Sequence, residues 1–152
     1  MKLCLISFTR SGSRLNEELC KQLTSKGFLC EGYTQERFFE NGKLNLMTDS
    51  LHEWTNKAFS SADGIIYIGA CGIAVRGIAP FIKDKYTDPA ILSIDEKGKY
   101  CIPLLSGHVG GANELAEMIA KITNGVPVIS TATDINQCFA VDVFASKNNL
   151  EI

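Results

Sequence analysis

Apolar and polar residues are arranged along the chain in two kinds of block. Short, nearly continuous apolar runs predict buried strands, because strands covered on both faces lose the usual alternation of polar and apolar residues. These runs cover residues 2–8, 28–33, 64–69, 90–94, 100–105 and 126–130. Between several of them, apolar residues recur at the spacing of one helix face. The alternation of the two blocks predicts an α/β fold with helices on both faces of a sheet.

Local signals mark where the predicted helices begin and end. Leucines recur at helical spacing over residues 15–23, and Gly27 supplies a stop after them. Residues 50–53, Ser-Leu-His-Glu, match a capping box, which predicts a helix that ends near residue 62. Pro80 is expected to kink or end a helical segment that follows the turn at residues 70–72.

One part of the sheet is predicted to be antiparallel. The runs at 90–94 and 100–105 flank the polar residues 95–99, a spacing typical of a β-hairpin. We therefore predict a three-layer sandwich with a mostly parallel, Rossmann-like or flavodoxin-like sheet and one antiparallel hairpin strand. The α/β domain is expected to cover residues 1–135. Residues 136–152 are expected to be a tail, or the start of a further domain, and they are unusually apolar for a terminus.

The predicted topology indicates where a ligand would bind. In open α/β sheets, ligands bind beyond the carboxyl ends of the strands. Four junctions follow strand ends and are rich in Gly, Ser or Thr. They cover residues 9–13, 69–76, 106–114 and 130–134. We expect these four loops to lie on the same edge of the sheet.

The segment 106–114 holds the least common residues of the chain. It contains three of the thirteen glycines and one of only two histidines, at a predicted junction between a strand and a helix. Backbone N–H groups in the first turn of a helix lack intrahelical partners, and the helix dipole favours negative charge there. The segment is therefore a candidate anion site.

His108 is the strongest candidate for chemistry in this segment. It lies between glycines at the mouth of the helix, where its imidazole is expected to be partly exposed. It could act as a general acid or base, or as an axial-type metal contact. A nucleophile pair with Ser106 is disfavoured, because the segment lacks the sequence of a nucleophile elbow. The other histidine, His52, is expected to be solvated.

The remaining candidates have two interpretations each. The loop at residues 9–13 loosely resembles a phosphate loop but lacks the known spacings, so it is either an anion site or a capped helix start. Arg10 favours binding, and Arg76 is either an anion fork or an ordinary surface arginine. Glu114 could simply favour the helix dipole. Residues 131–134 either contact a ligand or cap the next element.

Composition excludes several classes of protein. Across 152 residues, 15 basic and 17 acidic side chains leave a net charge of −2, and no basic stripe is present, which argues against nucleic acid as a partner. The six cysteines are scattered without zinc-ligand spacing, so we expect core residues in a reducing cytosol and no metal site. No run approaches the length of a membrane span and no signal peptide is recognisable, which predicts a cytoplasmic protein without a membrane partner.

Taken together, these residues resemble the N-terminal part of the CbiG family of cobalamin biosynthesis proteins, the cobalt-precorrin-5A hydrolases. The resemblance rests on four ordered blocks between about residues 64 and 134. They are Gly72-Ile73-Ala74-Val75-Arg76 with Ile78-Ala79-Pro80, Lys83-Asp84-Lys85 with Thr87-Asp88-Pro89-Ala90, Leu104-Leu105-Ser106-Gly107-His108 with Gly110-Gly111-Ala112-Asn113, and Thr131-Ala132-Thr133-Asp134.

The resemblance implies an enzyme of the anaerobic vitamin B12 route that opens the δ-lactone of cobalt-precorrin-5A and releases acetaldehyde. The cobalt belongs to the substrate, so no other cofactor is expected. His108 would be the general acid or base, while Asn113 and the Gly110 and Gly111 N–H groups would donate to an oxyanion or carboxylate, and Glu114 is a further catalytic candidate. The expected substrate-binding residues are Arg10, Ser11, Gly12, Gly72, Arg76, Lys85, Ser106, Gly107, Gly110, Gly111, Thr131, Thr133 and Asp134.

Two other functions remain open at the level of sequence. Members of the family are usually longer, so the chain could act with a C-terminal domain or partner subunit, or as a homodimer. It would then be a non-catalytic module that binds a corrinoid or another anion. A flavodoxin-like nucleotide-binding protein is the second alternative.

Overall fold

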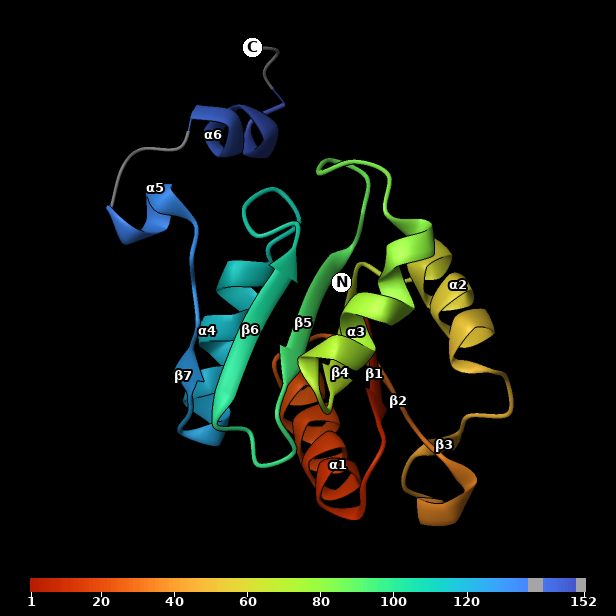
Figure 1. Cartoon of the computed structure of the whole chain (residues 1–152). Helices are drawn as coiled ribbons and strands as arrows, with labels where there is room; N and C mark the ends of the chain where they lie inside the picture. Colours follow the sequence, from red (N-terminus) through yellow and green to blue (C-terminus); the bar gives the residue numbers. More distant parts are fainter. Residues whose placement is uncertain (137–140, 150–152) are drawn as a thin grey trace.

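The computed structural model describes residues 1–136 and 141–149 of the chain, in three layers with a sheet in the middle (Figure 1). Within these residues the sheet has seven strands in the order β3-β2-β1-β4-β5-β6-β7. The strands are β1 (Lys2–Ser7), β2 (Leu29–Thr34), β3 (Asn45–Leu46), β4 (Gly64–Ile68), β5 (Ala90–Ile94), β6 (Tyr100–Leu105) and β7 (Val126–Pro127). The predicted fold class is confirmed.

The helices begin and end close to the predicted signals. They are α1 (Arg10–Ser25), α2 (Leu51–Ser61), α3 (Cys71–Ile78), α4 (Ala112–Thr123), α5 (Ala132–Ile135) and α6 (Val141–Lys147), with 3-10 turns η1 (Glu36–Phe38) and η2 (Ala79–Phe81). Ser50 Oγ accepts a hydrogen bond of 3.2 Å from the Glu53 N–H, which confirms the capping residue of α2. Helix α3 ends at Ile78, before Pro80, as expected for a residue that cannot continue a helix.

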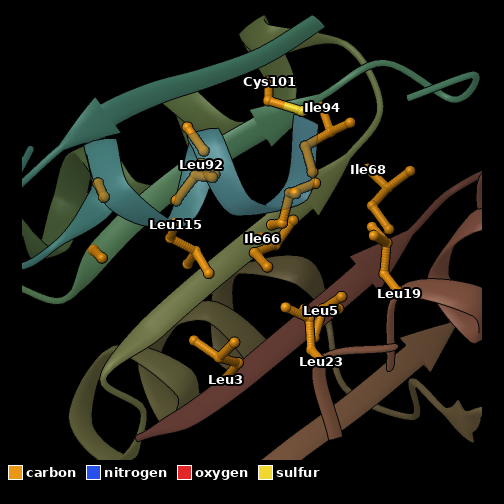
Figure 2. Close-up of a cluster of buried hydrophobic side chains, with 14 of the residues drawn as sticks. Leu3, Leu5, Leu19, Leu23, Ile66, Ile68, Leu92, Ile94, Cys101 and Leu115 are labelled. Carbon is orange, nitrogen blue, oxygen red and sulfur yellow. The ribbon is translucent and has the colours of Figure 1, made fainter. Parts of the chain in front are cut away.

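The two faces of the sheet carry separate apolar cores. Figure 2 shows the first, in which Leu19 and Leu23 of α1 and Leu115 of α4 lie near strand residues such as Leu5 and Ile66. Helices α2 and α3 cover the opposite face, where Trp54, Ala58, Ala74 and Ile78 pack with Cys4, Ile6, Ile65, Tyr67 and Ile91. Each fully buried Leu or Ile contributes about 1.5–3 kcal/mol, so the sheet is a rigid support for the loops at its edges.

Cys4, Cys20, Cys30 and Cys101 belong to these cores, as their isolated positions predict, whereas Cys71, at the start of α3, is in neither. Cys4 and Cys101 are buried, and burial raises the pKa of each thiol to about 11. Burial also raises the pKa of Cys20 to about 12. These thiols stay protonated near neutral pH, and a protonated thiol is a poor nucleophile and a poor metal ligand. Cys138 lies outside the described residues.

Strand direction divides the loops between two edges of the sheet. Strands β1, β2, β3, β4 and β5 are parallel, whereas β6 pairs antiparallel with β5, which confirms the predicted hairpin. Strand β7 runs parallel to β6, so it too opposes β1 to β5. We use "carboxyl edge" for the edge at which β1 to β5 end, and "amino edge" for the edge at which they begin.

The prediction that four loops share one edge is wrong. Ser7 at the end of β1 pairs with Ile68 at the end of β4, so residues 9–13 and 69–76 follow at the carboxyl edge. Leu105 at the end of β6 pairs instead with Ile91, near the start of β5. The hairpin thus returns the chain to the amino edge, where residues 106–114 and 130–134 lie.

The described C-terminal segment exposes both apolar and polar residues, the latter being Lys147, Asn148 and Asn149. In α6, Val141 and Phe144 are exposed, while Ala145 is buried. Phe139 and Leu150, which also suggested an apolar tail, lie outside the described residues. No helix in the described part of the chain combines the length and apolar character that a membrane crossing requires.

Candidate functional site

The loop between β6 and α4 is tightly folded at the amino edge. Ser106 adopts a left-handed backbone conformation, with φ of 58°, which is uncommon for a residue other than glycine. A Cβ on Gly110 would lie 2.4 Å from the Cβ of Ser106, so only glycine fits at position 110. Ser106 Oγ in turn donates a hydrogen bond of 3.0 Å to the carbonyl of Asp88. These contacts fix the loop that carries His108.

Asn113, in the first turn of α4, joins this loop to the start of α5. Its side chain is 5% exposed, and its Nδ2 donates hydrogen bonds of 3.0 Å to Thr131 Oγ1 and 2.5 Å to Asp134 Oδ2. A carboxamide nitrogen has two hydrogens, so both are used in these contacts. The sequence suggested Asn113 as a donor to a ligand; the structure shows it holding Thr131 and Asp134.

His108 lies beside the carboxylate that Asn113 holds. Its Nε2 is 3.3 Å from Asp134 Oδ2, and the two side chains are 22% and 37% exposed. A carboxylate at Nε2 favours the tautomer that carries the proton on this nitrogen and the lone pair on Nδ1. An imidazole oriented by a carboxylate is the arrangement of a general base. We call His108, Asn113, Thr131 and Asp134 the His108 cluster.

Two hollows that share Val109 lie along this edge. The first has a volume of about 190 Å³ and is lined by Lys85, Ser106, Gly107, His108, Val109 and Thr131. The second has a volume of about 450 Å³ and is lined by Met1, Ala62, Asp63, Tyr86, Thr87, Asp88, Pro89, Val109 and Gly110. The loop before β5 therefore contributes to both, and it brings Lys85 to the hollow that His108 lines.

That loop is held by its own aspartates. Asp84 accepts hydrogen bonds from the Thr87 hydroxyl at 2.5 Å and from the Tyr86 N–H at 2.8 Å, and these bonds lower the pKa of its carboxyl. Asp88 is 6% exposed, and its carboxylate accepts from the Lys83 N–H. Sequence reasoning missed this buried anchor, although an aspartate directly before Pro89 and a buried strand was a signal for it.

The helix mouth is less open to an anion than the sequence suggested. The N–H groups of Ala112 and Asn113 donate to the carbonyls of Ser106 and Gly107, at 3.2 and 3.0 Å, and the Gly111 N–H donates to His108. Gly111 and Asn113 are thus already engaged as donors. Among the described residues, the N–H groups of Val109 and Gly110 have no acceptor, which leaves these two to face a ligand.

Two of the other predicted residues are not placed in the cluster. Glu114 is 71% exposed at its side chain, and its Oε1 lies 2.7 Å from Lys147 Nζ of α6, so its contacts are those of a surface ion pair. Thr133 is part of α5, but its side chain lies outside the described part of the chain. The contacts of His108 with Asp134, and of Asn113 with Thr131 and Asp134, involve neither residue.

Five predicted substrate-binding residues lie at the opposite, carboxyl edge. Thr9 Oγ1 accepts a hydrogen bond of 2.9 Å from the Gly12 N–H, so the loop at residues 9–13 is a capped helix start. Arg10 lines a hollow of about 250 Å³, and the guanidinium of Arg76 lies over Gly72. Strands of five or six residues separate the two edges by roughly 17–20 Å. Arg10, Ser11, Gly12, Gly72 and Arg76 therefore do not belong to the His108 cluster.

The described residues contain no group of three or more His, Cys, Asp or Glu side chains placed to hold a metal ion. The donors that meet at the amino edge are instead one imidazole, one carboxylate, one carboxamide and a nearby ammonium group. That set suits proton transfer and the binding of an anion more than it suits a resident metal.

Comparison with known proteins gives consistent similarities. A family model described as "Cobalamin synthesis G N-terminal" matches residues 53–134. The chain is 40% identical over 149 residues to a cobalt-precorrin-5A hydrolase of Salmonella typhimurium, of which it spans 40% of the length, and 97% of this chain is covered. It is 41% identical over 114 residues to a cobalt-precorrin-5A hydrolase of Priestia megaterium, covering 72% of this chain and 30% of that protein.

A solved structure is also similar. The crystal structure of a cobalamin biosynthesis protein G homologue from Sulfolobus solfataricus matches with a TM-score of 0.66 and 27% identity, over 95% of this chain and 39% of that chain. The similarity therefore extends over 72% to 97% of this sequence and over less than half of each of these longer proteins.

Proposed function

The chain belongs to the cobalamin synthesis G N-terminal family, and from that premise we propose that it acts in the hydrolysis of cobalt-precorrin-5A, with the His108 cluster as its catalytic centre. One observation carries the proposal. The span that matches the family model, residues 53–134, contains the complete cluster and the loop that carries Lys85, whereas Arg10 lies outside it.

His108 would act as the general base for lactone opening. With Nε2 directed at Asp134, Nδ1 takes a proton from the water that attacks the lactone carbonyl. The ester C–O bond then breaks, and the imidazolium returns the proton to the departing oxygen. One water is consumed, and the product carries one new carboxylic acid and one new hydroxyl group.

The release of acetaldehyde follows from that hydroxyl group. A base removes its proton, the oxygen forms a carbonyl, and the adjacent C–C bond breaks. The macrocycle takes the electron pair of this bond and is then protonated. The two-carbon fragment leaves as acetaldehyde, so the second step is redox-neutral. In this proposal His108 serves both steps, because each needs a proton removed and later returned.

The loop would stabilise the charge that develops at the lactone carbonyl. Val109 lines both hollows and Gly110 lines the larger one, and the N–H group of neither residue is used within the described structure. Donors of this kind contribute about 10²–10³-fold in rate when they are directed at an oxyanion. Lys85 lines the hollow of His108 and would attract a carboxylate of the substrate.

The test is to supply cobalt-precorrin-5A to this chain and to follow acetaldehyde. Catalysis predicts acetaldehyde in proportion to enzyme and time. A saturable change in the substrate's visible spectrum without acetaldehyde would favour the second candidate, a corrinoid-binding module. Binding of flavin mononucleotide in place of the corrinoid would contradict both and restore the flavodoxin-like alternative.

The second candidate is kept because the hollows are small. Pockets that enclose a ligand of moderate size hold about 300–1,000 Å³. The hollow that His108 lines has a volume of about 190 Å³, which accommodates only part of a substituted macrocycle. A surface of this kind would bind one side of the corrinoid, and a partner would cover the other.

A further inference from the structure

The carboxyl edge carries a cleft whose charge the His108 cluster does not explain. Arg10 and Arg14 project from the first two turns of α1, and Arg37 comes from η1, between β2 and β3. All three line the same hollow of about 250 Å³. We call this hollow, defined by Arg10, Arg14 and Arg37, the arginine cleft. It lies at the other edge of the sheet from His108, so the two sites do not share lining residues.

The acidic side chains of the cleft are paired with a lysine. Lys43 Nζ lies 2.7 Å from Glu40 Oε2 and 3.9 Å from Glu17 Oε2. In the described parts of the chain, none of the three arginines has a carboxylate within ion-pair distance. Four cations and two acids line the hollow, so it carries a net charge of +2 in a chain whose net charge is −2.

Two of the arginines are placed where they destabilise the free protein. Arg10 is the first residue of α1, at the positive end of the helix dipole, and the first turn contains no acidic residue. Arg14 follows at i+4, so two like charges share one helix face. The acid that acts on both arginines is Glu40, whose carboxyl pKa is lowered chiefly by Lys43 and more weakly by Arg10 and Arg14. A sequence that breaks local rules in this way does so most often at a functional site.

We propose that the arginine cleft is a second binding site, which takes a dianionic phosphate group. A phosphate carries about −1.5 to −2 charges near pH 7, which matches the net charge of the lining. Guanidinium groups bind phosphate oxygens with paired N–H donors, and donors from two elements can surround a tetrahedral anion better than a planar one. The bound anion would also relieve the repulsion between Arg10 and Arg14.

The proposal is tested by calorimetric titration of the chain with inorganic phosphate at constant ionic strength. We expect one saturable site. Arg14→Gln and Arg37→Gln should each weaken binding by about tenfold or more, since each removes a charge-assisted contact. Lys26→Gln is the matched control, because it removes the same charge at the other end of α1, and it should bind phosphate as the wild type does.

Three results would overturn the proposal. They are the absence of a saturable site, an equal loss of affinity in Lys26→Gln, and binding of succinate, a planar-headed dianion, as tight as that of phosphate. Ribose 5-phosphate distinguishes the sources of the anion. If it binds more tightly than inorganic phosphate, the natural ligand is a phosphate ester; if it binds equally or less tightly, the ligand is free phosphate.

Thermal unfolding without phosphate separates binding from a structural role. Because Arg10 and Arg14 repel each other in the free protein, Arg14→Gln should have a midpoint equal to or above that of the wild type. A lower midpoint would mean that Arg14 supports the fold and would contradict the proposal. The phosphate titration is independent of acetaldehyde release, so its failure leaves the proposed function unaffected.

Discussion

The two edges of the sheet hold their polar groups in opposite ways. At the amino edge, Asn113 is buried, both hydrogens of its amide are used, and it holds the carboxylate that lies against His108. At the carboxyl edge, Arg10, Arg14 and Arg37 surround a hollow, and no carboxylate pairs with them in the described residues. The first arrangement is pre-organised for proton transfer, while the second has an excess of positive charge that would attract an anion.

The difference follows from one reversal of chain direction. Had β6 run parallel to β5, the loop after it would have opened at the carboxyl edge, where Arg10 lies. The hairpin places it instead beside the loop that precedes β5, where Ser106 Oγ can donate to the Asp88 carbonyl. The fold thereby separates the hydrogen-bonded His108 cluster at the amino edge from the positively charged arginine cleft at the carboxyl edge.

Among the substitutions that test the contrast between the two edges, Gly110→Ala is expected to have the largest effect on activity. The added Cβ would lie 2.4 Å from the Ser106 Cβ and 2.8 Å from the Ser106 carbonyl oxygen, so the loop must move. We expect acetaldehyde release to fall on the order of 10²-fold or more and unfolding to become about 1–3 kcal/mol easier. Phosphate binding at the carboxyl edge should be unchanged.

Gly27→Ala is the matched control for that substitution. Gly27 also has a positive φ, of 98°, but no atom lies within 4 Å of its added Cβ. It should therefore cost about 1 kcal/mol through backbone strain and leave the rate unchanged. A Gly110→Ala variant as active as Gly27→Ala would show that the loop does not position the chemistry.

A smaller effect is expected for Asp134→Asn, which tests positioning. The side chain keeps its size but no longer offers a carboxylate to His108 Nε2. We expect kcat to fall about 10- to 100-fold with little change in KM, and Asp134→Glu to recover part of the rate. The ¹⁵N spectrum of the imidazole should change from one tautomer to a mixture. An unchanged tautomer with a lowered kcat would assign another role to Asp134.

The smallest effect concerns the loop that both hollows share. The pKa of the Asp84 carboxyl is lowered because it accepts hydrogen bonds from Thr87 and Tyr86. Ionised Asp84 therefore stabilises the loop at pH values above 3.8, the ordinary pKa of this group. This contribution is lost as the pH falls through the lower, folded-state pKa. The amide resonances of Tyr86 and Thr87 should therefore titrate with a midpoint below 3.8. A midpoint at or above 3.8 would contradict the described hydrogen bonds.

Local signals predicted most of the fold. The capping residue Ser50, the stop before Pro80 and the hairpin at residues 95–99 are each confirmed, because caps, prolines and short turns act over a few residues. The direction of β7 depends instead on its pairing with β6, about 25 residues earlier in the chain, as in the register of Tyr100 with Val126. Local pattern cannot specify such a pairing. The predicted common edge is wrong because the hairpin reverses β6 and β7 follows the direction of β6, so the loops after both strands lie at the amino edge.

The residues of the site were predicted, but the contacts between them were not. His108, Asn113 and Asp134 were candidates from the sequence, and the family resemblance that named them is confirmed. Their partners were not predictable, since Asn113 contacts a carboxylate 21 residues away. At the other edge, Arg10 and Arg14 had a readable i,i+4 spacing, but Arg37 lies in a stretch without clear periodicity, and only the fold brings it to the cleft.

The most direct test of the central claim is the rate of acetaldehyde release by His108→Ala beside that of His52→Ala. His52 is the other histidine of the chain; it is exposed on α2, with its ring centroid 4.9 Å from that of Phe81. We predict a loss on the order of 10²-fold or more for His108→Ala and a change of less than about twofold for His52→Ala. A near-wild-type rate in His108→Ala would contradict the assignment of the His108 cluster as the catalytic centre.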